Sequence, residues 1–272
     1  MDFAGKTAII TGGATGIGFA LAKQMGRAGA RIILFEPREN RLQEAVTALT
    51  AENIDAKYLV GDVSKAEEIE ALADFAWAEN GRGDIIVNNA GVSGGRERVL
   101  GMDMAEARAL YDVNFWGVWN GISTFGNRYK ADGQPSAIYT VGSENSLFNA
   151  LPKTGGAYVS SKHAVLGLMD VLRREAPENI ELGLIIPGWV KSELSELQAD
   201  EAMDTDKFAA IIFKQMQAGE YYLVSHPYNV VRMEERWAEV YRAFEKYAPR
   251  HEGDDEGDIQ LWVERTRAGR KG

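Results

Sequence analysis

The 272-residue sequence predicts an α/β protein built on a single doubly wound parallel sheet with helices on both faces. Short apolar runs rich in β-branched residues alternate along the chain with longer segments of helical periodicity, a pattern typical of this fold class. A glycine-rich turn separates the first such run from the first helical segment. The length suits one large domain, because sheets of this class form a single core at this size.

The predicted strands are short and mostly apolar, as expected where both faces of a parallel sheet are buried. They cover residues 6–11, 31–36, 56–60, 84–89, 136–142, 180–187 and 220–225. The predicted helices fill most of the intervals, at 17–28, 39–52, 64–80, 103–131, 157–177 and 229–248.

Two segments are less regular than the rest. Residues 191–218 are rich in polar side chains, and we expect one or two short helices there that cover the substrate. Residues 249–272 are acidic near their start, and we expect a loosely ordered tail. The sequence therefore predicts one catalytic domain over 1–248, followed by an acidic C-terminal tail.

The composition excludes several classes of function. A net charge of −10 argues against a nucleic-acid or anionic membrane partner, and the absence of cysteine excludes disulfides and thiol catalysis. No apolar run is long enough to span a membrane, and the start at Met1 lacks the features of a signal peptide. The three histidines show no metal-ligand spacing, so no metal is expected. These observations predict a cytoplasmic protein that acts on a small molecule.

Three glycines, Gly12, Gly16 and Gly18, follow the first predicted strand and lead into the helix at 17–28. In a strand–turn–helix unit that binds a dinucleotide, the first glycine permits the turn and the second lets the backbone approach the pyrophosphate. The third lets the helix pack on the strand, and the helix N-terminus faces the negative charge. A structural turn in a protein that binds no nucleotide is the alternative. The pattern favours a Rossmann-type dinucleotide site.

Tyr158 and Lys162 stand four residues apart in the predicted helix 157–177 and therefore share one face. A phenol with a pKa near 10 is a weak acid–base catalyst at neutral pH. An ammonium about 4 Å away favours the phenolate by roughly 4 kcal/mol at an effective dielectric of about 20, which lowers the pKa by roughly three units. Such a pair also occurs on helices without catalytic function. Together with the glycine turn, it indicates proton and hydride transfer.

The chain resembles the short-chain dehydrogenase/reductase family over roughly residues 3–230. The motifs that carry the resemblance come in the family's order along the chain. They are the glycine pattern at 11–18, Gly61-Asp62-Val63, Asn88-Asn89-Ala90-Gly91, Asn114, Ser143, the Tyr158/Lys162 pair and Pro187 to Ser192. Residues 219–227 are similar to a subgroup that includes lignin-derived aryl carbinol dehydrogenases. The resemblance implies a dinucleotide-dependent enzyme acting on CH–OH groups.

The resemblance also implies a catalytic set of Asn114, Ser143, Tyr158 and Lys162. Tyr158 would be the general acid or base, and the Ser143 hydroxyl would hold the substrate oxygen, with Ser146 as the alternative serine. Lys162 would bind the nicotinamide ribose and lower the Tyr158 pKa. Asn114 would hold a water that leads to Lys162, or would be a structural asparagine.

Cofactor choice depends on Glu36, at the end of the second predicted strand, where an acidic side chain meets the adenosine ribose. A carboxylate there accepts hydrogen bonds from the ribose hydroxyls and repels a 2′-phosphate, which favours NAD. Arg38 and Arg41 follow, and either could bind the 2′-phosphate of NADP. The alternative is that both arginines lie in a solvated first turn of the next helix. The expected cofactor-binding residues are Gly12, Thr15, Gly16, Ile17, Gly18, Glu36, Asp62, Val63, Asn89, Gly91, Tyr158, Lys162, Pro187, Gly188, Val190 and Ser192.

Two of these cofactor residues also have a structural interpretation. Asp62 would meet the adenine amino group or act as a helix N-cap, for which Ser64 is the better candidate. Asn89 and its neighbours would line the cofactor or simply stabilise the sheet.

The substrate is expected to be a hydrophobic secondary alcohol or ketone, aromatic ones included. The segments that would line the pocket supply Leu147, Phe148, Leu151, Trp189, Leu194 and Leu197. An NADPH-dependent ketoreductase is the alternative, and a non-catalytic dinucleotide sensor is a further one.

By resemblance, the helices at 103–131 and 157–177 would pair between subunits in a homo-oligomer, a dimer or tetramer. Trp116, Trp119, Phe125, Val165, Leu168 and Leu172 would form that interface or belong to the core.

Overall fold

The computed structural model describes residues 1–94, 98–150, 155–192 and 200–269. Contacts between residues divide the chain into two units, Met1–Asn229 and Val230–Gly272. The first unit holds the whole sheet and every strand of the described chain, and the second is helical.

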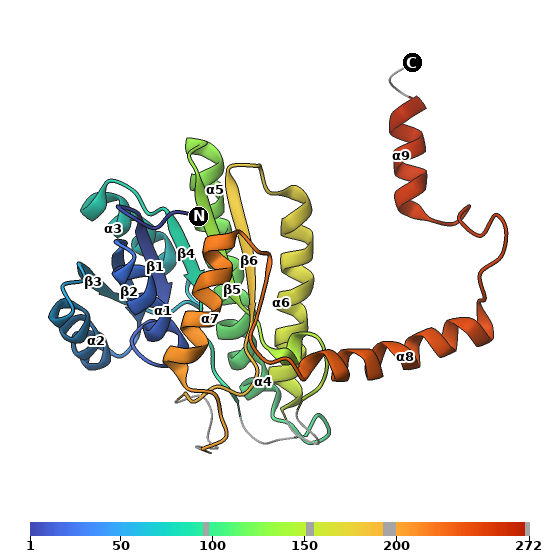
Figure 1. Cartoon of the computed structure of the whole chain (residues 1–272), viewed down its shortest axis with the longest axis horizontal. Helices are drawn as coiled ribbons and strands as arrows, with labels where there is room; N and C mark the ends of the chain where they lie inside the picture. The colour runs from blue at the N-terminus through green and yellow to red at the C-terminus, as the bar shows by residue number, and fades with distance from the viewer. Residues whose placement is uncertain (95–97, 151–154, 193–199, 270–272) are drawn as a thin grey trace. The chain divides into compact units, whose positions relative to one another are not determined.

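The first unit is built on a seven-stranded sheet of order β3-β2-β1-β4-β5-β6-β7 within the described residues (Figure 1). Every neighbouring pair of strands is parallel. The chain runs outward from β1 to β3, returns to β4 beside β1, and then continues to β7. This reversal beside β1 is the switch point at which doubly wound sheets bind ligands. The strands are β1 (Thr7–Thr11), β2 (Arg31–Glu36), β3 (Ala56–Val60), β4 (Ile85–Asn88), β5 (Ser136–Val141), β6 (Ile180–Ile186) and β7 (Tyr222–Val224).

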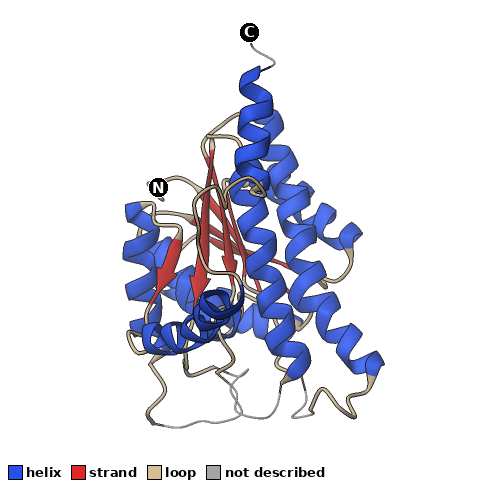
Figure 2. Ribbon diagram, turned by 90° about the vertical axis from the view of Figure 1, so that its right-hand side faces the viewer, coloured by secondary structure: helices blue, strands red, loops and turns tan. Residues whose placement is uncertain are grey.

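Helices cover both faces of this sheet, and Figure 2 shows the strands between two helical layers. One face packs against α1 (Gly16–Arg27), α2 (Glu39–Ala51) and α7 (Thr205–Ala218). The other packs against α3 (Ala66–Asn80), α5 (Gly117–Asp132) and α6 (Gly156–Glu175). Successive strand residues point to opposite faces, so Ile10 belongs to the first core and Ile9 to the second. The predicted doubly wound α/β fold is confirmed.

The predicted helix at 103–131 is confirmed without a gap from Met104 to Asp132, but its middle turn is π-helical. It consists of α4 (Met104–Tyr111), a π-helical turn (Asp112–Trp116) and α5. The side chain of Asp103 accepts a hydrogen bond from the Ala105 amide and caps the first of these. A π-turn adds a residue to the helix and is often found at functional sites, and here it contains Asn114.

The described part of the segment after β6 contains a helix, as expected for 191–218. It forms one helix of 14 residues, α7, whose N-cap Asp204 accepts hydrogen bonds from the Asp206 and Lys207 amides. Ahead of it, Val190 and Met203 form an isolated β-bridge. Residues 193–199 of this predicted substrate cover lie outside the described residues.

The second unit contains most of α8 (Asn229–Tyr247) and all of α9 (Ile259–Gly269). The tail predicted as loosely ordered therefore holds a helix. Asp258 stabilises the start of α9, because its side chain accepts hydrogen bonds from the Gln260 and Leu261 amides at 2.8 and 3.0 Å. Among the helices of the described residues, none is long and apolar enough to cross a membrane.

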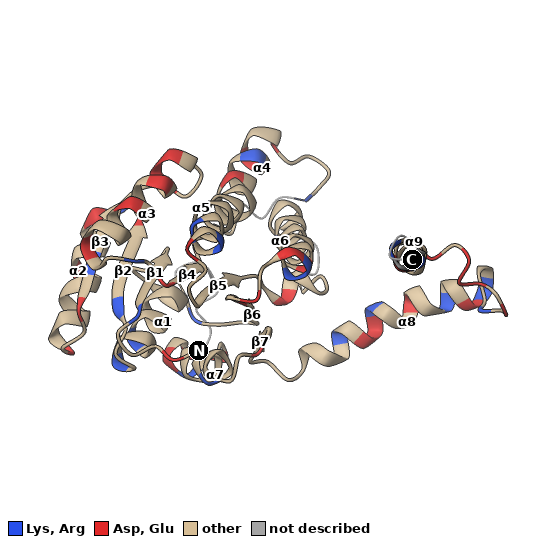
Figure 3. Cartoon of the chain, turned by 90° about the horizontal axis from the view of Figure 1, so that it is seen from above, with Lys and Arg blue, Asp and Glu red and all other residues tan. Residues whose placement is uncertain are grey.

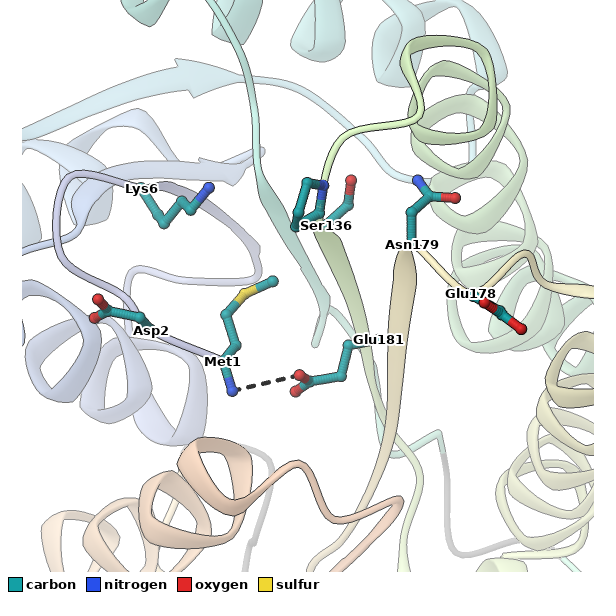
Figure 4. A pocket seen from close by; sticks show the side chains of 8 residues that line it. Met1, Asp2, Lys6, Ser136, Glu178, Asn179 and Glu181 are labelled. Atoms are coloured by element: carbon teal, nitrogen blue, oxygen red, sulfur yellow. Dashed lines mark ion pairs between the residues drawn. The ribbon is translucent and has the colours of Figure 1, made fainter.

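A pocket of about 380 Å³ lies at the amino ends of β5 and β6 (Figure 4). It is lined by Met1, Asp2, Lys6, Pro135, Ser136, Glu178, Asn179 and Glu181. The N-terminal ammonium pairs with Glu181 there at 3.3 Å. Open parallel sheets bind their ligands at the carboxyl ends of the strands, so this pocket is remote from the site described next.

Candidate active site

The predicted site residues gather at the carboxyl edge of the sheet. Gly12 follows β1, Asn89 follows β4, Ser143 follows β5 and Pro187 follows β6. Because all the strands are parallel, these positions share one edge although they are far apart in sequence.

The glycine turn is packed tightly against the end of β4. Gly12 has φ +59°, and a Cβ built there would lie 2.8 Å from the Ala90 Cα. A Cβ on Gly18 would lie 2.4 Å from Asn89 Nδ2. Contacts this close exclude a side chain at either position, so both glycines serve the approach of α1 to β4.

Asn89 fixes this turn through its side chain. Its Nδ2 donates hydrogen bonds to the carbonyl oxygens of Thr11 and Gly12, both at 2.9 Å. The Thr11 Oγ1 in turn accepts the amides of Asn89 and Ala90. The helix α1 begins at Gly16 with no acidic residue in its first turn. The result is a rigid loop that ends at a helix N-terminus suited to a phosphate.

Glu36 ends β2 with a carboxylate that is only 4% exposed. Arg38 binds both of its oxygens, from Nε at 2.7 Å and from Nη2 at 3.2 Å. Arg38, one of the two arginines considered as ligands of a phosphate, is therefore bound to Glu36, the carboxylate that is expected to bind the ribose.

Asp62 and Val63 follow β3. The Asp62 side chain accepts the Ser64 amide at 2.9 Å, and its own amide donates to Glu68. The helix α3 starts at Ala66 with Lys65 in the N-cap position, so the expectation that Ser64 or Asp62 caps it is wrong. Val63 is buried, and its carbonyl accepts a hydrogen bond from Asn120 at 3.0 Å.

The π-turn holds Asn114 in a fully buried position. Its amide group bonds both backbone groups of Val92, accepting the N–H at 2.8 Å and donating to the carbonyl at 2.9 Å. It also donates to Ser161 Oγ on α6 at 3.3 Å. A Cβ on Gly91 would lie 3.3 Å from Asn114 Oδ1 and 3.8 Å from Lys162 Nζ. The missing side chain at Gly91 thus leaves space beside both groups.

Ser143 and Tyr158 are joined by a side-chain hydrogen bond. The Ser143 Oγ accepts hydrogen bonds from the backbone and side-chain nitrogens of Asn145, at 3.1 and 3.3 Å. Since both lone pairs of the hydroxyl are engaged, its proton points to the tyrosine oxygen. Ser146, the alternative serine, instead accepts the amide of Ser143.

Burial raises the pKa of Tyr158, the Ser143 hydrogen bond opposes this rise, and the negative charge of Glu144 adds to it. The Lys162 Nζ lies 5.9 Å from the centre of the Tyr158 ring and donates to the Val141 carbonyl at 2.9 Å. Burial lowers the pKa of Lys162 to about 8. The expected fall of the tyrosine pKa is thus not what this structure shows, because the ammonium extends past the ring to the backbone of β5.

The loop after β6 is clamped by His226, which follows β7. The Gly188 amide donates to His226 Nδ1 at 3.2 Å, so that nitrogen is unprotonated and Nε2 donates to the Trp189 carbonyl at 3.2 Å. A Cβ on Gly188 would lie 2.5 Å from the imidazole ring. Farther along the loop, the Ser192 Cβ lies 3.4 Å from a Cβ built on Gly16. This loop therefore spans the site from the histidine to the glycine turn.

The model of the family described as short chain dehydrogenase matches residues 6–202. The chain belongs to this family. As a member, it is an oxidoreductase that acts on CH–OH groups.

The chain is 27% identical over 253 residues to 1-deoxy-11-beta-hydroxypentalenate dehydrogenase of Streptomyces avermitilis, which covers 89% of the chain and 93% of that protein. A solved short-chain dehydrogenase structure from Novosphingobium aromaticivorans has 29% identity and a TM-score of 0.84, with 98% and 96% coverage. The apo form of LigO from Sphingobium sp. strain SYK-6 has 26% identity and a TM-score of 0.83, covering all of this chain and 97% of that one.

Sequence reasoning about this short-chain dehydrogenase did not predict the contacts that Glu144, Ser161 and His226 make with site residues. Glu144 and Ser161 are sequence neighbours of the predicted catalytic residues Ser143 and Lys162, and this adjacency is the signal that could have identified them. His226 follows a predicted strand at the carboxyl edge, where ligand-binding loops lie, yet its partner Gly188 is 38 residues away. Of the expected pocket residues, Leu151, Leu194 and Leu197 lie outside the described residues.

Proposed function

We propose that this enzyme uses NAD and transfers a hydride between the nicotinamide and a hydrophobic secondary alcohol or ketone, aromatic ones included. The observation that carries the proposal is the hydrogen bond between Ser143 and Tyr158, with Lys162 and Asn114 buried behind them. A hydroxyl pair of this kind holds an alcohol or carbonyl oxygen and exchanges a proton with it.

The residues present fit a dinucleotide. The turn at Gly12 and Gly18 has no room for side chains, which brings a bare backbone to the start of α1. Glu36 offers a carboxylate at the end of β2, and Ser143 follows β5, with β1 and β4 between these two strands. In this proposal Thr15, Ile17, Asp62, Val63, Asn89, Gly91, Pro187, Gly188, Val190 and Ser192 complete the cofactor site, with Tyr158 and Lys162 at its nicotinamide end. When bound, the nicotinamide supplies or accepts the hydride.

The protein's own residues then manage the proton. The raised pKa of Tyr158 keeps the phenol protonated at neutral pH, which is the form that donates to a carbonyl oxygen. Ser143 orients that oxygen through its hydroxyl. In the opposite direction Tyr158 must first lose its proton through Lys162 and the space beside Gly91, next to Asn114. The resulting phenolate then takes the alcohol proton.

The preference for NAD rests on Glu36. Its carboxylate repels a 2′-phosphate, and it holds the nearest described arginine, Arg38, through two hydrogen bonds. Each oxygen keeps acceptor capacity for a ribose hydroxyl. The alternative is an NADPH-dependent ketoreductase, in which Arg38 leaves Glu36 for the phosphate. Thermal unfolding with saturating NAD, NADH, NADP or NADPH separates the two: a shift with the unphosphorylated pair alone supports NAD, and a shift with the phosphorylated pair contradicts it.

The hydrophobic substrate is supported by Phe148 and Trp189, which come after β5 and β6, the strands that also lead to Ser143 and Pro187. Phe148 is buried, and Trp189 is 39% exposed. The similarity of residues 219–227 to the aryl carbinol dehydrogenase subgroup adds aromatic alcohols to the proposed range. A screen of hydrophobic secondary alcohols with the preferred cofactor tests this range, and activity confined to charged or sugar substrates would contradict it.

Tyr158→Phe is the decisive variant for the mechanism. It keeps the ring and removes the hydroxyl, so we expect turnover to fall by about 10²–10⁴-fold with the cofactor-induced thermal shift retained. Activity equal to that of the parent would exclude the mechanism. A non-catalytic sensor would show the thermal shift but no turnover in the parent with any alcohol or ketone.

We also propose that the enzyme is a cytoplasmic homodimer or homotetramer, with neither a nucleic acid nor a membrane as partner. Trp116 and Trp119, on the π-turn and α5, are 49% and 44% exposed and suit an interface between subunits. Phe125 and Val165 are completely buried and belong to the core, and Leu168 and Leu172 pack against that core. Of the residues expected at the interface between subunits, only Trp116 and Trp119 are therefore exposed enough to form it. Loss of self-association in Trp119→Glu would support it.

A further inference from the structure

The helix α8 carries a regular apolar stripe. Val230, Met233, Trp237, Val240, Phe244 and Tyr247 are separated alternately by three and four residues. This spacing is the a/d pattern of a coiled coil, with a mean of 3.5 residues, and it places all six side chains on one narrow seam. The seam runs along the whole helix, from its first turn to its last.

Within its own unit the seam is mostly exposed. No residue of α8 is buried, and Trp237, Phe244 and Tyr247 are 51%, 61% and 77% exposed. An exposed row of large apolar side chains on a monomeric protein marks an interaction surface. A strict a/d seam is the geometry with which one helix packs against another helix.

The charges of α8 fit a partner that is not a membrane or a nucleic acid. Arginine, lysine and glutamate alternate around the polar side of the helix, as the mixed bands along α8 in Figure 3 show. Four basic and four acidic residues leave the helix neutral in a chain of net charge −10. Interfacial membrane helices carry an excess of lysine and arginine on that face. A neutral helix meets a second copy of itself without repulsion.

The sizes of the seam residues indicate the direction of pairing. Small or flexible side chains, Val230 and Met233, lie near the start of α8, and the large Phe244 and Tyr247 lie near its end. In an antiparallel pair Val230 faces Tyr247, Met233 faces Phe244, and Trp237 faces Val240. Each layer then combines a larger with a smaller side chain. A parallel pair would stack two valines in one layer and two tryptophans in another, which leaves voids and crowding.

We propose that α8 pairs antiparallel with α8 of a second copy of this chain, through the seam from Val230 to Tyr247. This interface is separate from the exposed tryptophans of the π-turn and α5. The two interfaces together would build a tetramer, and either alone a dimer.

Disulfide cross-linking tests the register in the full-length protein, which contains no cysteine of its own. In the double variant Val230→Cys/Tyr247→Cys, the antiparallel pair brings position 230 to position 247 of the partner, and we expect oxidation to give a covalent dimer linked 230–247′. The two positions on one helix are roughly 26 Å apart, far beyond the ~7 Å limit for a disulfide, so the link forms between chains only. The single variants are the controls and should stay uncross-linked. A 230–230′ link would overturn the antiparallel direction, and no link in the double variant would overturn the pairing.

A second experiment removes the seam. Val240→Glu places a charge at its centre, and light scattering should show the mass of the assembly reduced by half. Val231→Glu introduces the same change one position outside the seam and should leave the mass unchanged. Cofactor-induced thermal shifts of both variants report that the first unit remains folded. An unchanged mass for Val240→Glu, or an equal loss in both variants, contradicts the proposal.

Discussion

Lys162 donates a hydrogen bond from Nζ to the carbonyl oxygen of Val141 at 2.9 Å. The bond crosses from α6 to the end of β5 and holds the lysine where it is only 3% exposed. Burial lowers the pKa of Lys162 to about 8, so the folded protein holds this proton less tightly than the unfolded chain does. The charge that the proposed chemistry uses is therefore kept at a cost in folding stability.

Lys162→Met should stabilise the protein at pH 7 while it abolishes turnover. The folded-state pKa is about 8 and the unfolded value 10.5, so the parent's stability rises with pH across that window and is lowest below it. The lowered pKa of Lys162 costs the folded parent about 3 kcal/mol of stability at pH 7, which the variant regains. Losing the hydrogen bond to Val141 costs the variant about 1 kcal/mol. We expect a net gain of roughly 2 kcal/mol in urea unfolding, shrinking towards pH 10. Lys214→Met, at an exposed position, is the control and should change little. A less stable variant at pH 7 would contradict this account.

Asn114→Ala should destabilise the protein markedly. The alanine removes the buried side chain of the π-turn that forms part-buried hydrogen bonds with both the amide and the carbonyl of Val92, and each orphaned group costs about 1–3 kcal/mol. Denaturant unfolding should therefore show a loss of roughly 2–4 kcal/mol. Asn127→Ala, on the exposed side of α5, should lose less than about 0.5 kcal/mol. Equal losses in the two variants would show that the buried amide has no special structural role.

Glu144→Gln should move the pH profile of alcohol oxidation to lower pH. Burial is the main cause of the raised pKa of Tyr158, and the negative charge of Glu144 raises it further. Removing that charge lowers the tyrosine pKa, so the phenolate forms at lower pH. The measurement is kcat/KM for oxidation against pH, with Glu178→Gln, at the other end of the sheet, as the control. A profile that does not move, or that moves to higher pH, would exclude this electrostatic effect.

His226→Phe should raise the KM for the cofactor more than it changes kcat. Burial lowers the pKa of His226, against the opposing hydrogen bond to Trp189. As the pH falls below 6.5, the unfolded chain takes up the proton before the folded one, so the histidine's contribution to stability is lost on the acid side. Protonation of Nδ1 also breaks the bond from the Gly188 amide and loosens the loop. The parent's KM should therefore rise at acid pH, and that of His226→Phe should be high throughout. His251→Phe, an exposed change in the second unit, is the control, and its KM should match that of the parent. An unchanged KM in His226→Phe would contradict a role of this histidine in holding the loop for the cofactor.

Local patterns in the sequence predicted most of the fold. The alternation of apolar and helical segments predicted the order of the strands and helices, because burial on both faces of a parallel sheet requires continuous apolar runs such as 32–35. Fixed spacings also predicted which residues meet locally, since Tyr158 and Lys162 share a face of any helix that contains them. The short-chain dehydrogenase resemblance assigned roles to both, which the proposed experiments test.

Contacts between distant segments were decided only by the tertiary structure. The clamp of His226 on Gly188 and the reach of Lys162 to Val141 depend on where each strand ends in space. Burial then set the direction of the pKa shifts, and it reversed the one expected for Tyr158. The sequence by itself determined which elements form and which chemical groups the site contains. The protonation behaviour of those groups depends on depth and on partners brought by the folded sheet, because desolvation outweighs a charge that lies beyond hydrogen-bonding reach.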